Sequence, residues 1–82
     1  MSFLIEITTP EKLVASHQAD FAEVPGKDGA IGILSGHAAL LSELGTGDLT
    51  VTSGNKTETF KVSGGYLEIR DNKVRVLADS VS

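Results

Sequence analysis

The sequence contains no cysteine and no tryptophan, and its aromatic residues are three phenylalanines and one tyrosine. Without cysteine, the chain has neither a disulfide framework nor a thiolate metal site. No apolar run approaches the roughly 18 residues that span a bilayer, and no signal peptide is expected at the N-terminus. Seven Lys and Arg are scattered among eleven Asp and Glu, for a net charge of −4. Because nucleic-acid binding needs clustered cations, that class of partner is disfavoured.

Short alternating stretches dominate the sequence and indicate β-strands. Phe3–Thr8, for example, has Phe3, Ile5 and Ile7 on one face and Glu6 on the other. Other strands are expected at Lys12–Ser16, Asp20–Val24, Ile31–Leu34, Asp48–Ser53, Lys56–Val62, Tyr66–Arg70 and around Val74, Val76 and Ala78. The pattern predicts a single all-β domain over residues 1–82, an antiparallel β-sandwich or flattened barrel of about eight to ten short strands.

Three turn signals separate the later strands. Ser53-Gly54-Asn55 predicts a hairpin turn, and Asp71-Asn72 predicts a tight turn. Between them, Ser63-Gly64-Gly65 is expected to let the chain bend or bulge.

The stretch Val24–Leu44 is a long excursion carried by this scaffold, rich in glycine. The spacing of Gly26, Gly29 and Gly32 differs from G-x-G-x-x-G and no long helix follows, so a dinucleotide site is not indicated. Residues 38–44 are predicted to be irregular or a 3₁₀ turn. The leucines of this segment either cap an open end of the sandwich or form an interface patch: they are Leu40, Leu41 and Leu44.

Candidate catalytic and metal-binding residues are few. His17 and His37 are the only histidines, too few for a zinc site without cysteine. Ser35 lies two residues before His37, but a hydrolase would also need an orienting carboxylate, and none is evident. His37 is either hydrogen-bonded within its loop or contacts a partner. The acidic residues Glu58, Glu68, Asp71 and Asp79 are interpreted as a solubilising surface.

These observations favour a binding or structural module without an active site. Two alternatives from other classes stay open. One is a free-standing β-sandwich that binds a small ligand, which would need a concave pocket with convergent aromatic side chains; the candidates are Phe3, Phe21, Phe60 and Tyr66. The other is a hydrolase that uses Ser35 and His37.

Three segments together resemble one protein family. They are FLIEITTPEKLVAS (3–16), VPGKDGAIGILSGHAALL (24–41) and FKVSGGYLEIRDNKVRVLAD (60–79). This chain is similar to the N-terminal β-sandwich domain of the epsilon subunit of F-type ATP synthase. The resemblance implies a non-catalytic subunit of the central stalk, without cofactor or metal, which binds the gamma subunit and the c-ring. It also implies a peripheral position on the cytoplasmic face of the bacterial inner membrane.

The resemblance carries contact positions over to matching residues. Thr9, His37 and Ser42 match positions that lie against the gamma subunit in the family. The segment that faces the c-ring matches Lys27, Asp28, Gly29, Ala30 and Ile31. A domain this small with two attachment surfaces is expected to expose an unusually apolar sheet face or edge.

The chain also departs from the family pattern. Ala39 replaces a proline after Gly-His-Ala, which leaves the main chain less fixed there. Ala30 stands where some relatives have an acidic residue, so Asp28 is the nearest carboxylate. Many relatives continue into a helical hairpin that restrains ATP hydrolysis or binds ATP, whereas this sequence stops at Ser82. Neither hairpin-mediated inhibition nor an ATP site is therefore expected.

Overall fold

The computed structural model describes residues 1–82 and consists of eight β-strands. The strands are β1 (Phe3–Thr8), β2 (Leu13–Ala19), β3 (Phe21–Gly26), β4 (Gly29–Leu34), β5 (Leu40–Glu43), β6 (Thr46–Ser53), β7 (Lys56–Arg70) and β8 (Lys73–Val81). Hydrogen bonds link them in the order β2-β1-β8-β7-β6-β3-β4, and β5 pairs with β7. The structure contains no helix, and hence none long and apolar enough to cross a membrane.

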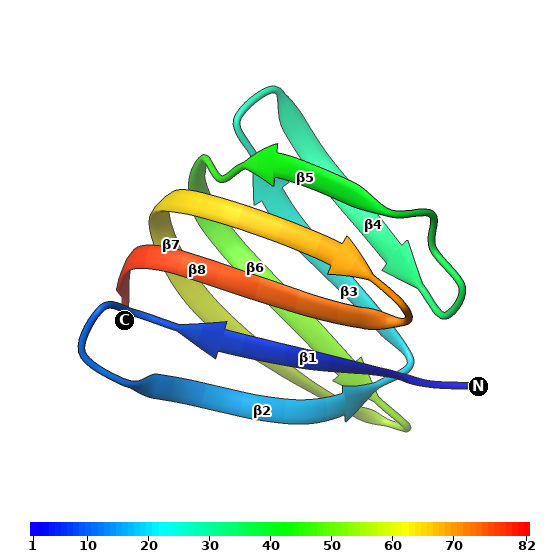
Figure 1. Ribbon diagram of the computed structural model, residues 1–82. Helices are drawn as coiled ribbons and strands as arrows, with labels where there is room; N and C mark the ends of the chain where they lie inside the picture. The colour runs from blue at the N-terminus through cyan, green and yellow to red at the C-terminus, as the bar shows by residue number, and fades with distance from the viewer.

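Two layers face each other, and β7 takes part in both (Figure 1). The first half of β7 pairs with β6 in the back layer, which continues through β3 to β4. Its second half pairs with β8 and β5 in the front layer, which continues through β1 to β2. The chain changes layer at Gly64 and Gly65, which have φ of 66° and 113°. The predicted bend is thus confirmed, but the two strands expected on either side of it are one bent strand.

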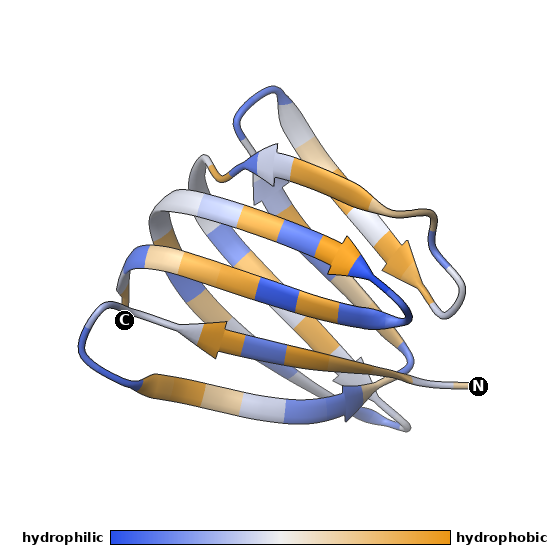
Figure 2. Cartoon of the chain, in the orientation of Figure 1, coloured by the Kyte–Doolittle hydropathy of each residue, from blue (hydrophilic) through white to orange (hydrophobic).

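The core lies between the layers and contains no buried polar or charged residue. The predicted inward face of β1 is confirmed, because Phe3, Ile5 and Ile7 are all buried. In the front layer, Ile5 pairs with Val74, which pairs with Ile69, so apolar side chains form rows across neighbouring strands. Burial of each such side chain contributes about 1.5–3 kcal/mol. Figure 2 shows that hydrophobic residues predominate along β1 and β8, interrupted by hydrophilic ones.

One strand pair differs from the antiparallel sandwich that the sequence predicts. β1 and β8 run parallel, whereas all other neighbouring strands are antiparallel. β1 and β8 are far apart in the sequence, so no hairpin turn fixes their relative direction. Local alternation predicts each strand but carries no information on this pairing.

The prediction of an irregular segment or 3₁₀ turn at residues 38–44 is wrong over Leu40–Glu43. These residues form β5, which pairs with the second half of β7. Leu40 packs against the core, whereas Leu41 is 72% exposed, so two consecutive leucines point to opposite sides. Leu44 is buried. Leu40 and Leu44 therefore belong to the core, whereas Leu41 is exposed, as the interface alternative requires.

Replacement of Gly65 by alanine tests the bend. A Cβ atom there would overlap the carbonyl oxygen of Leu77 and lie 3.0 Å from Cα of Ala78. Both are main-chain atoms of β8 that cannot move without breaking the ladder. We expect Gly65→Ala to lower the free energy of unfolding by at least about 2 kcal/mol, measured by urea denaturation.

Gly54→Ala is the matched control. Gly54 also has a positive φ, of 61°, but its Cβ atom would meet nothing within 4 Å. Only the backbone strain remains, so the expected cost is about 1 kcal/mol. Equal denaturation midpoints for the two variants would show that the close approach to β8 does not limit the bend.

Candidate functional site

The serine and histidine considered for catalysis do not form a nucleophile–base pair. Nδ1 of His37 lies 2.7 Å from the carbonyl oxygen of Ala38, within its own loop. The Ser35 hydroxyl donates instead to the Ser2 carbonyl oxygen and to Oδ1 of Asn72, both at 3.3 Å. No hydrogen bond joins Ser35 to His37, and no group of three acidic or histidine side chains is placed to hold a metal ion.

Asn72 joins three segments that are distant in the sequence. Its Nδ2 donates to the Ser2 carbonyl oxygen at 2.9 Å. Its Oδ1 accepts from the Gly36 N–H at 2.9 Å and from Ser35. Asn72 has a φ of 60°, which asparagine tolerates better than most residues. We call these bonds the Asn72 clasp; it fixes the β4–β5 connection against the N-terminus and the β7–β8 turn.

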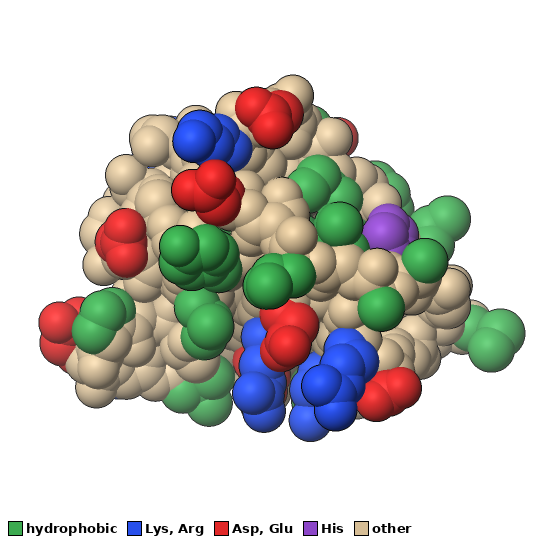
Figure 3. Space-filling model, turned by 45° about the horizontal axis from the view of Figure 1, so that its top comes forward, with side chains coloured by type: hydrophobic (Ala, Val, Ile, Leu, Met, Phe, Trp, Pro, Cys, Tyr) green, Lys and Arg blue, Asp and Glu red, His purple; other side chains and the backbone are tan.

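The outward side of β2, β1, β8, the second half of β7 and β5 is here called the front face. It exposes four large apolar side chains: Leu13 (54%), Leu41 (72%), Tyr66 (54%) and Leu77 (49%). Tyr66 lies directly opposite Leu77, and Leu77 is followed across the layer by Thr8 and Leu13. Figure 3 shows hydrophobic side chains gathered on this side of the molecule. These apolar side chains share the face with the charged residues Glu6, Glu68 and Arg75, which lie in one row across it.

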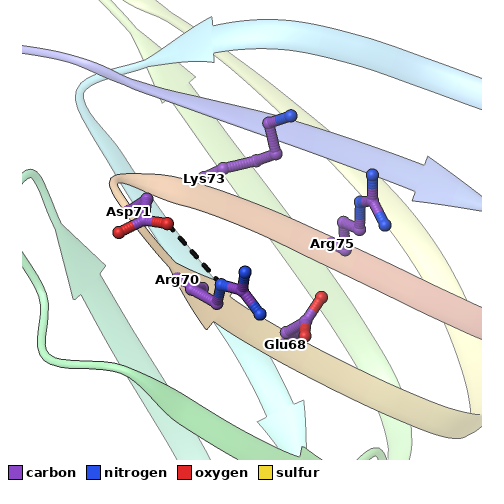
Figure 4. A pocket seen from close by; sticks show the side chains of 5 residues that line it. All are labelled: Glu68, Arg70, Asp71, Lys73 and Arg75. Carbon is purple, nitrogen blue, oxygen red and sulfur yellow. Dashed lines mark ion pairs between the residues drawn. The ribbon is translucent and has the colours of Figure 1, made fainter.

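The end of the front face beside the β7–β8 turn is charged rather than apolar. A shallow hollow of about 300 Å³ is lined by Glu68, Arg70, Asp71, Lys73 and Arg75 (Figure 4). Nε of Arg70 lies 3.5 Å from Asp71, and Nε of Arg75 lies 3.8 Å from Glu6 on β1. These are exposed ion pairs, which contribute little to stability. The hollow therefore adds a charged border to the apolar surface.

The small-ligand alternative needs aromatic side chains that converge on one pocket, and these do not. Phe3 is buried in the core and Phe60 packs against it. Phe21 is exposed on the back layer, whereas Tyr66 is exposed on the front face. The hollow beside the β7–β8 turn has no hydrophobic residue in its lining.

The segment Lys27–Ile31 lies at the β3–β4 hairpin, beside the end of β5 (Figure 1). The Lys27 N–H donates to the Glu43 carbonyl oxygen at 3.0 Å, which fixes the hairpin to the end of β5. Asp28, Gly29 and Ala30 are all exposed. The hairpin therefore borders the β5 end of the front face.

The three residues matched to gamma contacts do not cluster. Thr9 follows the C-terminal end of β1. His37 lies near the other end of that strand, because its neighbours Ser35 and Gly36 bond to Ser2 and Asn72. Ser42, on β5, is half-buried, and its hydroxyl donates to the Glu43 carbonyl oxygen. A partner that touched all three would extend along the whole front layer.

The two-layer arrangement of eight short strands defines a small β-sandwich domain. The family model of the ATP synthase Delta/Epsilon chain β-sandwich domain matches residues 2–82. The chain therefore belongs to this family, as the resemblance in its sequence predicts.

Curated relatives carry the name ATP synthase epsilon chain. The relative from Carboxydothermus hydrogenoformans is 47% identical over 76 residues, which cover 93% of this chain and 57% of the relative. The relative from Nitratidesulfovibrio vulgaris is 47% identical over 79 residues, covering 96% of this chain and 59% of the relative. The chain thus spans less than two thirds of the length of these relatives.

Solved structures share the fold. A chain of the Euglena gracilis mitochondrial ATP synthase OSCP/F1/c-ring assembly superposes with a TM-score of 0.91 at 20% identity, over 99% of this chain and 52% of that one. A chain of the Tetrahymena thermophila mitochondrial ATP synthase central stalk and c-ring gives a TM-score of 0.80 at 19% identity. The match covers 96% of this chain and 64% of that one.

The Asn72 clasp can be tested by two substitutions at one position. Asn72→Gly keeps the positive φ available and removes only the side-chain bonds, whereas Asn72→Ala also adds backbone strain. We expect Asn72→Gly to cost about 1 kcal/mol and Asn72→Ala about 1–2 kcal/mol more. Hydrogen exchange at the Gly36 amide should accelerate in both variants. Unchanged exchange at Gly36 in Asn72→Gly would show that the clasp does not hold the β4–β5 connection.

Proposed function

We propose that this chain is the N-terminal β-sandwich of a non-catalytic central-stalk subunit of an F1Fo ATP synthase. In this proposal it binds the gamma subunit and the c-ring and helps to couple proton translocation to ATP synthesis. The observation that carries the proposal is the family match over residues 2–82, together with epsilon-chain relatives at 47% identity. The corresponding location is the cytoplasmic face of the bacterial inner membrane, as a peripheral part of the complex, with no bound cofactor.

The front face is the proposed contact surface for the gamma subunit. Its four exposed apolar side chains lie between Thr9 at one end of β1 and His37 near the other. Aromatic and apolar side chains at the centre of an interface with a charged border are typical of protein–protein contacts. Tyr66 and Leu77 would lie at the centre of such a contact, and Arg70, Lys73 and Arg75 along its border.

The β3–β4 hairpin is the proposed contact with the c-ring, through Lys27, Asp28, Gly29, Ala30 and Ile31. Its exposed tip supports this assignment, because Asp28, Gly29 and Ala30 are open to contact by a partner. With alanine at position 30, Asp28 is the carboxylate at the tip that is free to meet a cation. The neighbouring cation, Lys27, is already paired, because its Nζ lies 3.6 Å from a carboxylate oxygen of Glu43.

Binding to the gamma subunit can be measured by titration calorimetry against a purified F1 head that lacks epsilon. The Leu41 side chain is 72% exposed, so Leu41→Lys should leave the fold unchanged. If the front face is the interface, the variant buries an unpaired charge and should bind at least about tenfold more weakly.

The matched control is Thr59→Lys, which adds the same charge to an exposed position in the half of β7 that belongs to the back layer. It should bind like the unmodified chain. Equal weakening by Thr59→Lys and Leu41→Lys would point to a general effect of charge. Absence of any binding to a head that accepts full-length epsilon would argue against the proposed function.

The c-ring contact predicts a different outcome for the hairpin. Asp28 is exposed and belongs to the hairpin rather than to the proposed gamma contact, so Asp28→Lys should keep the affinity for the F1 head within about twofold. In reconstituted F1Fo, the same variant should weaken attachment to the ring and lower proton-driven ATP synthesis. Reduced affinity for the isolated head would instead place the hairpin at the gamma interface.

A further inference from the structure

β4 ends the back layer, and its only strand partner is β3. Pro25 of β3 shows which way the main-chain groups of β4 point. The Pro25 carbonyl oxygen accepts from the Gly45 N–H at 2.8 Å, so it faces away from β4. Pro25 lies opposite Ala30 in the register. The Pro25–Ala30 pair is therefore not hydrogen-bonded, and the main-chain groups of Ala30 face outward.

In an antiparallel pair of strands, hydrogen-bonded and non-hydrogen-bonded residue pairs alternate. The direction in which the other main-chain groups of β4 point follows from this alternation. Ile31 and Ile33 bond to β3, whereas Gly32 and Leu34 face outward like Ala30. Of these outward groups, the Leu34 carbonyl oxygen accepts from the His37 N–H at 3.2 Å. The N–H and C=O of Ala30 and Gly32 and the N–H of Leu34 have no strand beside them.

β4 carries none of the usual protection of a free edge. Native sheets cover such edges or interrupt them with charges, proline or bulges. The segment Gly29–Ser42 contains no Asp, Glu, Lys or Arg, and the Leu34 side chain is 61% exposed. The other end strands are partly covered: the Gln18 carbonyl oxygen of β2 accepts from the Ser53 hydroxyl at 2.6 Å. In β5, the Glu43 carbonyl oxygen accepts from Lys27.

We propose that the β4 edge pairs with the β4 edge of a second copy of this chain, antiparallel about a two-fold axis at Gly32. This register places Gly32 opposite Gly32 and Ala30 opposite Leu34. Each outward donor then meets an outward acceptor, and the second lone pair of the Leu34 carbonyl oxygen is free to take part. The contact is isologous, so it closes as a dimer.

Side chains and charge agree with this register. The exposed Leu34 of one copy lies over Ala30 of the other, where a small residue leaves room. The chain as a whole has a charge of −4, but the uncharged edge lets two copies approach. Pairing of two six-residue strands buries less than the roughly 1,600 Å² of a standard stable interface. The dimer should therefore form only at high concentration.

Sedimentation velocity over about a hundredfold range of concentration measures this equilibrium. A Cβ atom at position 32 meets the Phe21 ring at 3.6 Å, an ordinary contact, so Gly32 can be replaced without disturbing β3. Gly32→Lys places two like charges opposite each other at the axis and should weaken the dimer about fivefold or more. Gly32→Glu should do the same alone, and an equimolar mixture of the two variants should restore association. Gly32→Ala, which keeps the N–H and adds no charge, is the control and should associate like the unmodified chain.

Amide hydrogen exchange provides a second readout that needs no variant. Exchange at Ala30, Gly32 and Leu34 should slow as concentration rises, whereas Ile31 and Ile33 should not change. A chain that stays monomeric over the whole range would overturn the proposal. So would a dimer of unchanged affinity in Gly32→Lys, which would move the contact to another surface such as the front face.

Discussion

The fold depends on one strand that belongs to both layers. β7 starts in the back layer beside β6 and ends in the front layer between β8 and β5. The change of layer happens at Gly65, where the main chain passes so close to β8 that a side chain has no room. The two halves of the core meet at this corner, because the inward residues of both halves of β7 face the same apolar interior, Val62 before the bend and Leu67 after it. Without this glycine pair the main chain of β7 could not pass so close to β8, and the strand could not bend at this point into the front layer.

Most of this architecture could be predicted from local pattern. Alternation in Phe3–Thr8 and in the strands around Leu49 and Val74 predicted both the strands and their buried faces, because a half-buried strand repeats every two residues. β5 was missed because it has only four residues and its two leucines are adjacent, which hides the alternation. It is a strand because β7 lies beside it, and the sequence of the segment alone does not carry that information. The parallel pairing of β1 with β8 has the same origin in tertiary structure.

The candidate site divides in a similar way. The Asp71-Asn72 pair predicts a turn, and the structure has one, with both residues at positive φ. That the Asn72 side chain would reach Ser2, 70 positions earlier, follows only from the arrangement of the strands. The front face is likewise assembled from outward residues of five strand segments. The sequence of no single segment indicates that such a face exists. By contrast, the contact positions Thr9, His37 and Ser42 came from family resemblance, and the structure distributes them along one layer.

The shared strand also determines how a mechanical load crosses the domain. A torque applied at the β3–β4 hairpin enters the back layer and passes along its hydrogen-bond ladder through β6 to β7. At β7 the load passes into the front layer along the covalent main chain, and not only through contacts between side chains. A contact of 3.1 Å between Nε2 of His17 and a carboxylate oxygen of Glu58 joins the layers again at the opposite edge. Shear between the layers must therefore strain the main-chain geometry at Gly65, so the two layers resist sliding past each other.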